Sequence, residues 1–256
     1  MIVTTDHAAN GSVRELRLDR PPVNALSPEL VSALDAAVRD APGDGAEAVV
    51  LTGAPGIFSA GLDVPHFLTL DRDGVTDAWR RFLSLLGALA TCPVPLAAAL
   101  TGHSPAGGAV VSIFCDYRVM AEGRFKIGFN EVQVGIVLPA SFQLAIRRLV
   151  GRRHAERLSI GALLLSPDEA RAINLVDEVV PVEEVVERAL AWCRSILALP
   201  REAMLKTRHN ARAALIEGFE SFPEKDLEDL VDRWCSEETQ AALRAMVARL
   251  AAKKAG

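Results

Sequence analysis

The sequence has few of the features that accompany nucleic-acid binding. Its formal net charge is −5, and only 5% of its residues are aromatic. The densest basic patch, between Arg147 and Arg157, has the spacing of an amphipathic helix pair, and no aromatic platform accompanies it. Proteins that bind nucleic acid usually present a basic stripe on one face. We therefore expect no nucleic-acid partner.

Long apolar runs are also missing. No stretch reaches the roughly 20 apolar residues of a membrane-spanning helix, so we expect no membrane partner. Residues 1–6 have neither the basic start nor the apolar core of a secretion signal. Together these two absences predict a cytoplasmic protein.

Signals of metal and phosphate binding are absent as well. The His, Asp and Glu residues show no metal-ligand spacing, so we expect no metal. Neither a phosphate-loop pattern nor a dinucleotide-binding glycine pattern occurs. The cysteines are widely spaced and form no Cys-x-x-Cys pair, which predicts reduced residues in or near the core: Cys92, Cys115, Cys193 and Cys235.

Half of the 256 residues are apolar, which is enough for a large core. Strand patterns occupy 12–18, 48–53, 96–102, 117–121 and 125–129, and helical patterns occupy 27–43, 75–90, 106–115, 142–150 and 152–165. After residue 182 the patterns are helical: 183–198, 201–217, 224–234 and 237–252. We predict an α/β domain over residues 1–195 and a helical region over 196–256. That region either folds back on the core or forms a subunit interface, and it contains apolar residues that favour burial: Leu215, Phe219 and Phe222.

Two glycine-bearing turns are the most informative features. Each follows an apolar run that ends in Thr-Gly, and each passes through small residues into Ala-Gly: Phe58-Ser59-Ala60-Gly61-Leu62-Asp63 and Gly102-His103-Ser104-Pro105-Ala106-Gly107-Gly108. Turns of this kind can expose two convergent backbone N–H groups. Such a pair, one of them at a helix N-terminus, suits a developing oxyanion. The pattern indicates an enzyme whose reaction forms an enolate or a tetrahedral oxyanion.

Glu131 is the candidate acid/base residue. It follows an apolar segment and is flanked by Phe129, Val132 and Val134. Apolar surroundings disfavour the charged form of a carboxylate and raise its pKa toward a range useful for a general base. Two structural alternatives are that Glu131 caps the following segment or pairs with an arginine.

The two turns resemble the crotonase (enoyl-CoA hydratase/isomerase) superfamily, as do Cys115-Asp116-Tyr117-Arg118 and the segment from Asn130 to Ile136. The likeness runs from about residue 13 to residue 181 and continues more loosely through the helical tail. It implies a spiral of ββα units with a trimerising, helical C-terminal region. It also implies acyl-CoA thioesters as substrates, with no cofactor apart from the CoA that the substrate carries.

Within the superfamily, the segment around Glu131 resembles the mitochondrial-type Δ3,Δ2-enoyl-CoA isomerases. Related hydratases carry a second glutamate two residues after the Gly-Gly pair, where this chain has Val110. The resemblance implies that the N–H groups of Leu62 and Gly107 form an oxyanion hole. The substrate-binding residues that it implies are Ala60, Gly61, Leu62, Asp63, Val64, Gly107 and Asn130.

Other conspicuous residues have simpler explanations. Asp63 is expected to cap the segment after Gly61. His103 has the position of an ordinary turn residue, and Asp116 that of a capping or ion-pairing residue. Trp79 and Phe82 share one face of the helix over 75–90, an arrangement more typical of a core than of a tunnel.

These observations predict an isomerase that moves the double bond of a 3-enoyl-CoA to the trans-2 position. A double-bond shift needs only one base, which removes a proton from C2 and returns one at C4. One alternative is a hydratase or another crotonase-type thioester enzyme, with Asp63 as a possible second carboxylate. The other is a non-catalytic acyl-CoA-binding protein. A homotrimer or a dimer of trimers is expected, and the sequence specifies neither the acyl-chain length nor its branching.

Overall fold

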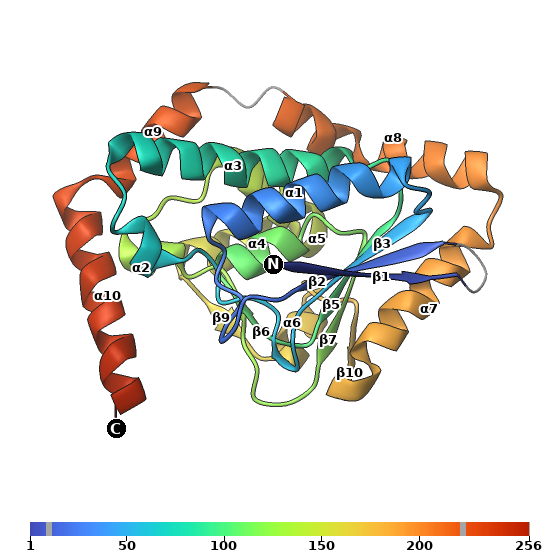
Figure 1. The fold of residues 1–256 in the computed structure, drawn as a ribbon, viewed down its shortest axis with the longest axis horizontal. Helices are drawn as coiled ribbons and strands as arrows, with labels where there is room; N and C mark the ends of the chain where they lie inside the picture. Colours follow the sequence, from blue (N-terminus) through green and yellow to red (C-terminus); the bar gives the residue numbers. More distant parts are fainter. Residues whose placement is uncertain (9–11, 221–223, 256) are drawn as a thin grey trace.

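The computed structural model describes residues 1–8, 12–220 and 224–255. It is a mixed α/β structure whose helices cover a sheet and form a helical C-terminal region (Figure 1). The larger sheet has six strands in the order β1-β2-β3-β5-β7-β10. Their bounds are Ile2–His7, Val13–Leu18, Ala48–Thr52, Leu96–Leu100, Tyr117–Ala121 and Glu178–Val180. Strand β1 pairs antiparallel with β2, and the other neighbours pair in parallel.

The smaller sheet has four short strands in the order β4-β6-β8-β9. Their bounds are Gly56–Ile57, Gly102–Pro105, Ile127–Gly128 and Leu164–Leu165. The helices are α1 Pro28–Gly43, α2 Val64–Phe67, α3 Arg72–Thr91, α4 Gly107–Ser112, α5 Ala140–Ile160, α6 Pro167–Ala172, α7 Val185–Leu197, α8 Arg201–Glu220, α9 Glu224–Trp234 and α10 Glu237–Ala255. Two short 3-10 helices are η1 Glu131–Val134 and η2 Val182–Glu184.

Every residue of the central strands β3, β5 and β7 is buried. Since successive side chains of a strand point to opposite sides, both faces of these strands are covered. Val49 and Leu51 of β3 join the larger core, which includes residues of α1 and α3. Ala48 and Val50 join a smaller core, which is closed by α7. A parallel sheet covered on both faces is the reason why these strands are continuously apolar in sequence.

The C-terminal helices fold back on the core of the same chain. Helix α8 contacts α3 and α5, α9 contacts α3, and α10 contacts α2 and η1. Leu215 and Phe219 are buried, as expected, whereas Phe222 lies outside the described residues. The first of the two arrangements predicted for the tail is therefore present.

Several predicted elements have different bounds. Strand β1, which was not predicted, is a largely exposed edge strand with little alternation of burial. Helix α5 runs through the two predicted helices with a break at Gly151, whose φ of 71° is not helical. It ends at Ile160, because residues 164–165 pair with β8 as strand β9. Helix α4 spans six residues, fewer than predicted.

Cysteine burial agrees with the prediction at three of four positions. Cys92, Cys115 and Cys193 are buried, and burial raises the pKa of the Cys115 thiol to about 12. Cys235 is exposed, contrary to the prediction, because it lies in the turn between α9 and α10. No helix in the described part of the chain has an apolar stretch of the length and purity needed to cross a bilayer.

The glycines of the two Thr-Gly turns allow backbone to pack directly on backbone. A Cβ at Gly102 would lie 1.9 Å from the carbonyl carbon of Gly56, and one at Gly53 would lie 2.4 Å from the carbonyl oxygen of Ile57. Strand β4 therefore pairs with β6 at a separation that no side chain would permit. This pairing brings the two turns together.

We expect Gly102→Ala to destabilise the fold by about 3 kcal/mol, since rigid backbone atoms would have to move. The matched control is Gly87→Ala in α3, where an added Cβ meets nothing within 4 Å. The control should be neutral or stabilising by up to about 1 kcal/mol, because alanine favours a helix interior. Urea unfolding of both variants measures the difference, and equal free energies would contradict the steric argument.

Candidate active site

The two turns meet through strands β4 and β6. Gly61 adopts a φ of +86°, and a Cβ at that position would lie 3.0 Å from the backbone nitrogen of Gly107. A Cβ at Gly107 would in turn lie 3.3 Å from the backbone nitrogen of Leu62. The backbone around Gly61 and Leu62 thus lies directly against the start of α4.

Two backbone N–H groups at this junction are unused. Leu26 forms a parallel bridge with Leu62, in which the N–H of Leu26 donates to Gly61 O and that of Asp63 donates to Leu26 O. This bonding pattern leaves the N–H of Leu62 pointing away from Leu26. Gly107 is the first residue of α4, where an N–H has no partner inside the helix. Within the described residues, neither the Leu62 N–H nor the Gly107 N–H donates to a protein acceptor.

The backbone just before this helix is strained. Ala106 has φ 48° and ψ −126°, a conformation that residues with a Cβ rarely adopt. Its N–H donates to Gly128 O at 2.9 Å, and its C=O accepts from Val110. Strain of this kind persists only where the surroundings enforce it. The positive φ of this turn thus lies at Ala106, and Gly107 itself has none.

The two glycines of the Gly-Gly pair have different roles. A Cβ at Gly108 would lie 2.7 Å from Ser59 O, so this position needs glycine for close packing. A Cβ at Gly107 would meet the flexible end of Leu26 at 3.2 Å and would lie beside the Leu62 nitrogen. A side chain at Gly107 would therefore stand beside the backbone nitrogen of Leu62.

Glu131 reaches the same region through strand β8. Gly128, three residues before it, pairs with Pro105 of β6 and accepts the hydrogen bond from Ala106. Glu131 is the first residue of the 3-10 helix η1 and is 9% exposed. Among the described residues its buried Oε2 has no hydrogen-bond partner, and neither does Oδ1 of Asn130.

Burial sets the protonation of Glu131. Removal of the carboxylate from water raises its pKa to about 7, and a hydrogen bond from its own backbone N–H opposes the shift only in part. No ion pair is recorded for this carboxylate in the described part of the protein, so the arginine-pairing alternative does not apply. A carboxylate with a pKa near neutrality can both accept and return a proton.

Asp63 is fully engaged in structure. Its Oδ1 accepts from the N–H of His66 at 3.2 Å and so caps α2, as predicted. Its Oδ2 pairs with Arg20 Nη2 at 2.5 Å. The neighbouring predicted binding residues differ in exposure: Ala60 is exposed, Leu62 is half-buried, and Gly61 and Val64, the first residue of α2, are buried.

Two supporting residues escaped the sequence analysis. Asn24 has φ 49°, and its side chain accepts from the Arg20 N–H and donates to Phe58 O. Its own C=O accepts from the Ser59 hydroxyl at 2.7 Å. Arg20 and Asn24 thus hold the first glycine-bearing turn in place. The Pro-Pro pair between them marked a turn, but nothing in the sequence related it to residues 58–63.

The remaining candidates have structural roles. The Nδ1 of His103 accepts from the Lys126 N–H, and its ring stands edge-on to Phe125. Trp79 and Phe82 are buried in contact with each other, as the core prediction required. In the described ranges, no group of three or more His, Cys, Asp and Glu side chains could hold a metal ion.

The raised pKa of Glu131 has a consequence for stability. The folded state binds this proton more tightly than the unfolded state, so stability falls as the pH rises from about 4.5 to about 7. Glu131→Gln removes the buried charge. We expect the difference in unfolding free energy, Glu131→Gln minus parent, to increase by roughly 2–3 kcal/mol between pH 5 and pH 8. Urea titrations at several pH values measure this gain.

The control is Glu228→Gln on α9, which makes the same change of charge at an exposed position. It should show no comparable growth with pH. A constant difference between Glu131→Gln and the parent across this range would mean that the Glu131 carboxylate ionises as freely in the folded as in the unfolded state.

Comparisons with known proteins agree with this geometry. A family model described as enoyl-CoA hydratase/isomerase matches residues 8–241. The mitochondrial enoyl-CoA delta isomerase 1 of Mus musculus is 33% identical over 257 residues, which cover 99% of this chain and 88% of that protein. A probable enoyl-CoA hydratase of Mycobacterium avium is 32% identical over 207 residues, 79% of each chain.

A solved structure matches nearly the whole of this chain. The crystal structure of human mitochondrial delta3-delta2-enoyl-CoA isomerase superposes with a TM-score of 0.94, at 31% identity and with 99% of both chains covered. The mixed α/β fold with its helical C-terminal region is therefore the crotonase fold. On the family match and on relatives that cover nearly its full length, this chain belongs to the enoyl-CoA hydratase/isomerase family.

Proposed function

We propose that this protein is a Δ3,Δ2-enoyl-CoA isomerase, which converts a 3-enoyl-CoA into the trans-2-enoyl-CoA. The observation that carries the proposal is one buried carboxylate, Glu131, whose Oε2 has no hydrogen-bond partner and which is linked through strand β8 to a junction with two unused backbone N–H groups. The names of the full-length relatives from mouse and human support the same activity. Oxidation of unsaturated acyl chains is the metabolic setting that the family implies.

The chemistry follows from these groups. The Glu131 carboxylate takes a proton from C2 of the thioester, and the electron pair of the broken C–H bond delocalises into the thioester as an enolate. The N–H groups of Leu62 and Gly107 donate to the enolate oxygen, where the negative charge develops. Glu131 returns the proton at C4 while the remaining electrons form the C2–C3 double bond. Substrate and product are isomers, so no co-reactant is consumed.

A single carboxylate fits this stoichiometry better than it fits hydration. Addition of water benefits from two carboxylates, which position the water, take one proton and deliver another. Val110, at the place of the second glutamate of related hydratases, is a buried apolar residue. Asp63, the other candidate, already caps α2 and pairs with Arg20. Hydration therefore remains the second candidate, favoured by relatives that are named probable hydratases.

The third hypothesis is an acyl-CoA-binding protein without activity. This hypothesis does not explain why the Glu131 carboxylate is buried without a cation beside it, since an isolated charge in an apolar site is costly. Binding of a saturated acyl-CoA without turnover of any enoyl-CoA would favour it.

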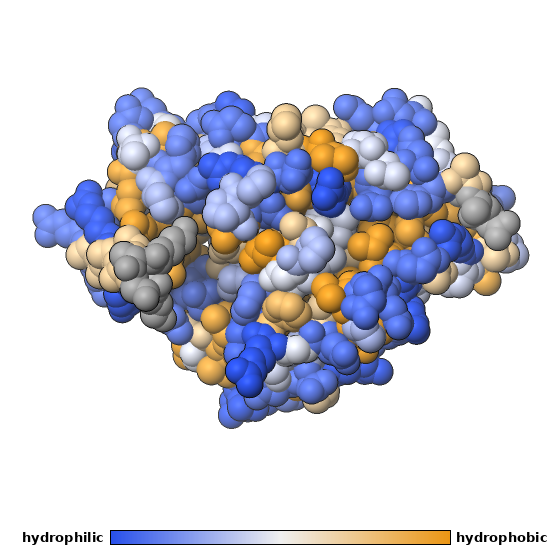
Figure 2. Space-filling view, turned by 60° about the horizontal axis from the view of Figure 1, so that its bottom comes forward, coloured by the Kyte–Doolittle hydropathy of each residue, from blue (hydrophilic) through white to orange (hydrophobic). Residues whose placement is uncertain are grey.

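The proposal extends to the state of the protein. Its substrate carries the only coenzyme, and we propose a homotrimer or a dimer of trimers in the cytoplasm, with residues 196–256 serving oligomerisation and covering the acyl pocket of the 1–195 core. Exposed apolar side chains such as Ile160, which is 78% exposed, and Leu163 support association. Figure 2 shows apolar surface distributed across the middle of the face that it presents.

The decisive experiment offers the purified protein 3-enoyl-CoA and trans-2-enoyl-CoA separately. Formation of the conjugated thioester from the first, followed by its ultraviolet absorption, with little loss of the second to hydration, supports the isomerase. Hydration of the second at a comparable or higher rate would replace the isomerase by a hydratase.

We expect Glu131→Gln to lower the isomerisation rate by roughly 10²–10⁴, the range typical of a positioned general base. In the parent, kcat/KM should rise as the pH passes about 7, because only the ionised carboxylate accepts the proton. Steady-state assays across pH 5.5–9 measure both effects. Near-parental turnover by the variant would remove Glu131 from the mechanism.

Gly107→Ala should place its methyl group between the two N–H donors, 3.3 Å from the Leu62 nitrogen. Since displacement of the oxyanion resembles loss of a donor, we expect kcat to fall by about 10²–10³. The protein should remain folded, because the nearest side-chain atom belongs to the flexible Leu26. Gly87→Ala is again the control, and equal losses in the two variants would show that the space in front of Gly107 takes no part in the reaction.

A further inference from the structure

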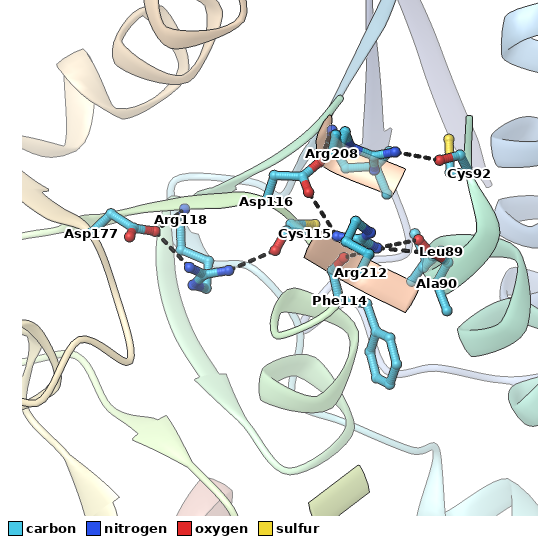
Figure 3. Close-up of polar contacts among 11 residues, drawn as sticks. Leu89, Ala90, Cys92, Phe114, Cys115, Asp116, Arg118, Asp177, Arg208 and Arg212 are labelled. Carbon is cyan, nitrogen blue, oxygen red and sulfur yellow. Dashed lines mark hydrogen bonds and ion pairs between the residues drawn. The ribbon is translucent and has the colours of Figure 1, made fainter. Parts of the chain in front are cut away.

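Two buried arginines hold the segment that follows α4, Phe114-Cys115 (Figure 3). Arg212 of α8 donates from Nη2 to Phe114 O at 2.9 Å, and Arg118 of β7 donates from Nη1 to Cys115 O at 2.7 Å. These carbonyls belong to the second and third residues after Ser112, the last residue of α4. The two guanidinium groups are 1% and 2% exposed.

Arg212 also binds the end of α3. The same Nη2 donates to Leu89 O and Ala90 O, and Nη1 pairs with Asp116 Oδ1 at 2.7 Å. Burial opposes the ionisation of Asp116, but Arg212 and Arg208 outweigh it and hold the pKa of this carboxyl below its usual value. One guanidinium group thus fastens the ends of α3 and α4 to the C-terminal helical region.

The opposite end of α4 carries the strain. Ala106 is held at a φ of 48° immediately before Gly107. Every residue of α4, from Gly107 to Ser112, is buried. Backbone strain persists only where the surroundings enforce it, and the fixed segment after α4 is part of those surroundings.

We propose that Arg212 is a positioning residue for the oxyanion donor at Gly107. The C-terminal helical region then also positions the site, because its helix α8 holds the segment that follows α4. This inference rests on the proposed function, because it assigns the Gly107 N–H to the substrate oxygen.

Arg208 provides a matched control within the same network. It lies one helical turn before Arg212 on α8, pairs with Asp116 Oδ2 at 2.8 Å and donates to Cys92 O at 2.7 Å. It makes no recorded hydrogen bond to Phe114 or to Cys115 within the described residues. Arg212→Lys and Arg208→Lys both keep the charge beside Asp116 but lose the planar fork that binds several carbonyls at once.

The test combines kinetics with a spectroscopic probe of the oxyanion hole. The probe is the CoA thioester of a para-dialkylamino-cinnamic acid, whose absorption moves to longer wavelength when its carbonyl oxygen accepts stronger hydrogen bonds. For Arg212→Lys we expect a kcat lower by roughly ten- to a hundredfold, since small displacements of a catalytic donor have effects of this size. KM should stay within about threefold, and the red shift of the bound probe should decrease. Arg208→Lys should keep both kcat and the red shift.

Equal losses of kcat in the two lysine variants, or a full red shift in Arg212→Lys, would overturn the inference. Arg118→Lys, which loosens the segment after α4 from strand β7, is measured in parallel. If Arg212→Lys does not fold, a lower kcat and a smaller red shift in Arg118→Lys support the inference, and parental values of both overturn it. A parent protein that neither binds the probe nor shifts its absorption would instead contradict the proposed function.

Discussion

Direct contact of backbone with backbone is the constraint on which the site depends. Strands β4 and β6 approach so closely at Gly56 and Gly102 that no Cβ fits between them. Only this approach brings the turn around Gly61 against the start of α4. Glycine at these positions costs conformational entropy in the folding reaction. The preceding strands β3 and β5 are fully buried, and their packing offsets that cost.

The site combines several features that would each destabilise an ordinary protein. Oε2 of the buried Glu131 has no hydrogen-bond partner, Ala106 is held at a positive φ, and two backbone donors have no acceptor among the described residues. Surrounding packing offsets these terms, because the large core encloses α4 and the segment after η1. Groups that protein contacts leave unsatisfied are those that a substrate can satisfy, which is why unfavourable local features gather where the chemistry is proposed.

Charge is organised differently on the two sides of α4. On the proposed substrate side, burial raises the pKa of Glu131, and no cation pairs with this carboxylate among the described residues. On the far side Asp116 is surrounded by guanidinium groups, and its pKa is lowered (Figure 3). Loss of contact with water therefore accompanies pKa shifts of opposite direction at these two carboxyls, since the presence or absence of an arginine partner decides which effect is larger. The helical C-terminal region supplies two of these arginines, Arg208 and Arg212.

The sequence by itself determined the main elements, the two glycine-bearing turns, the family and the candidate base. These follow from local signals: apolar periodicity, and motifs of adjacent residues around Gly61, Gly107 and Glu131. Tertiary structure decided the rest. It paired residues 164–165 with β8 and ended α5 earlier than periodicity predicted, placed the strain at Ala106 and not at Gly107, and committed Asp63 to Arg20. It also joined Arg212 to carbonyls about a hundred residues away in sequence. Such contacts depend on which surfaces meet in space, and no local pattern of residues encodes that.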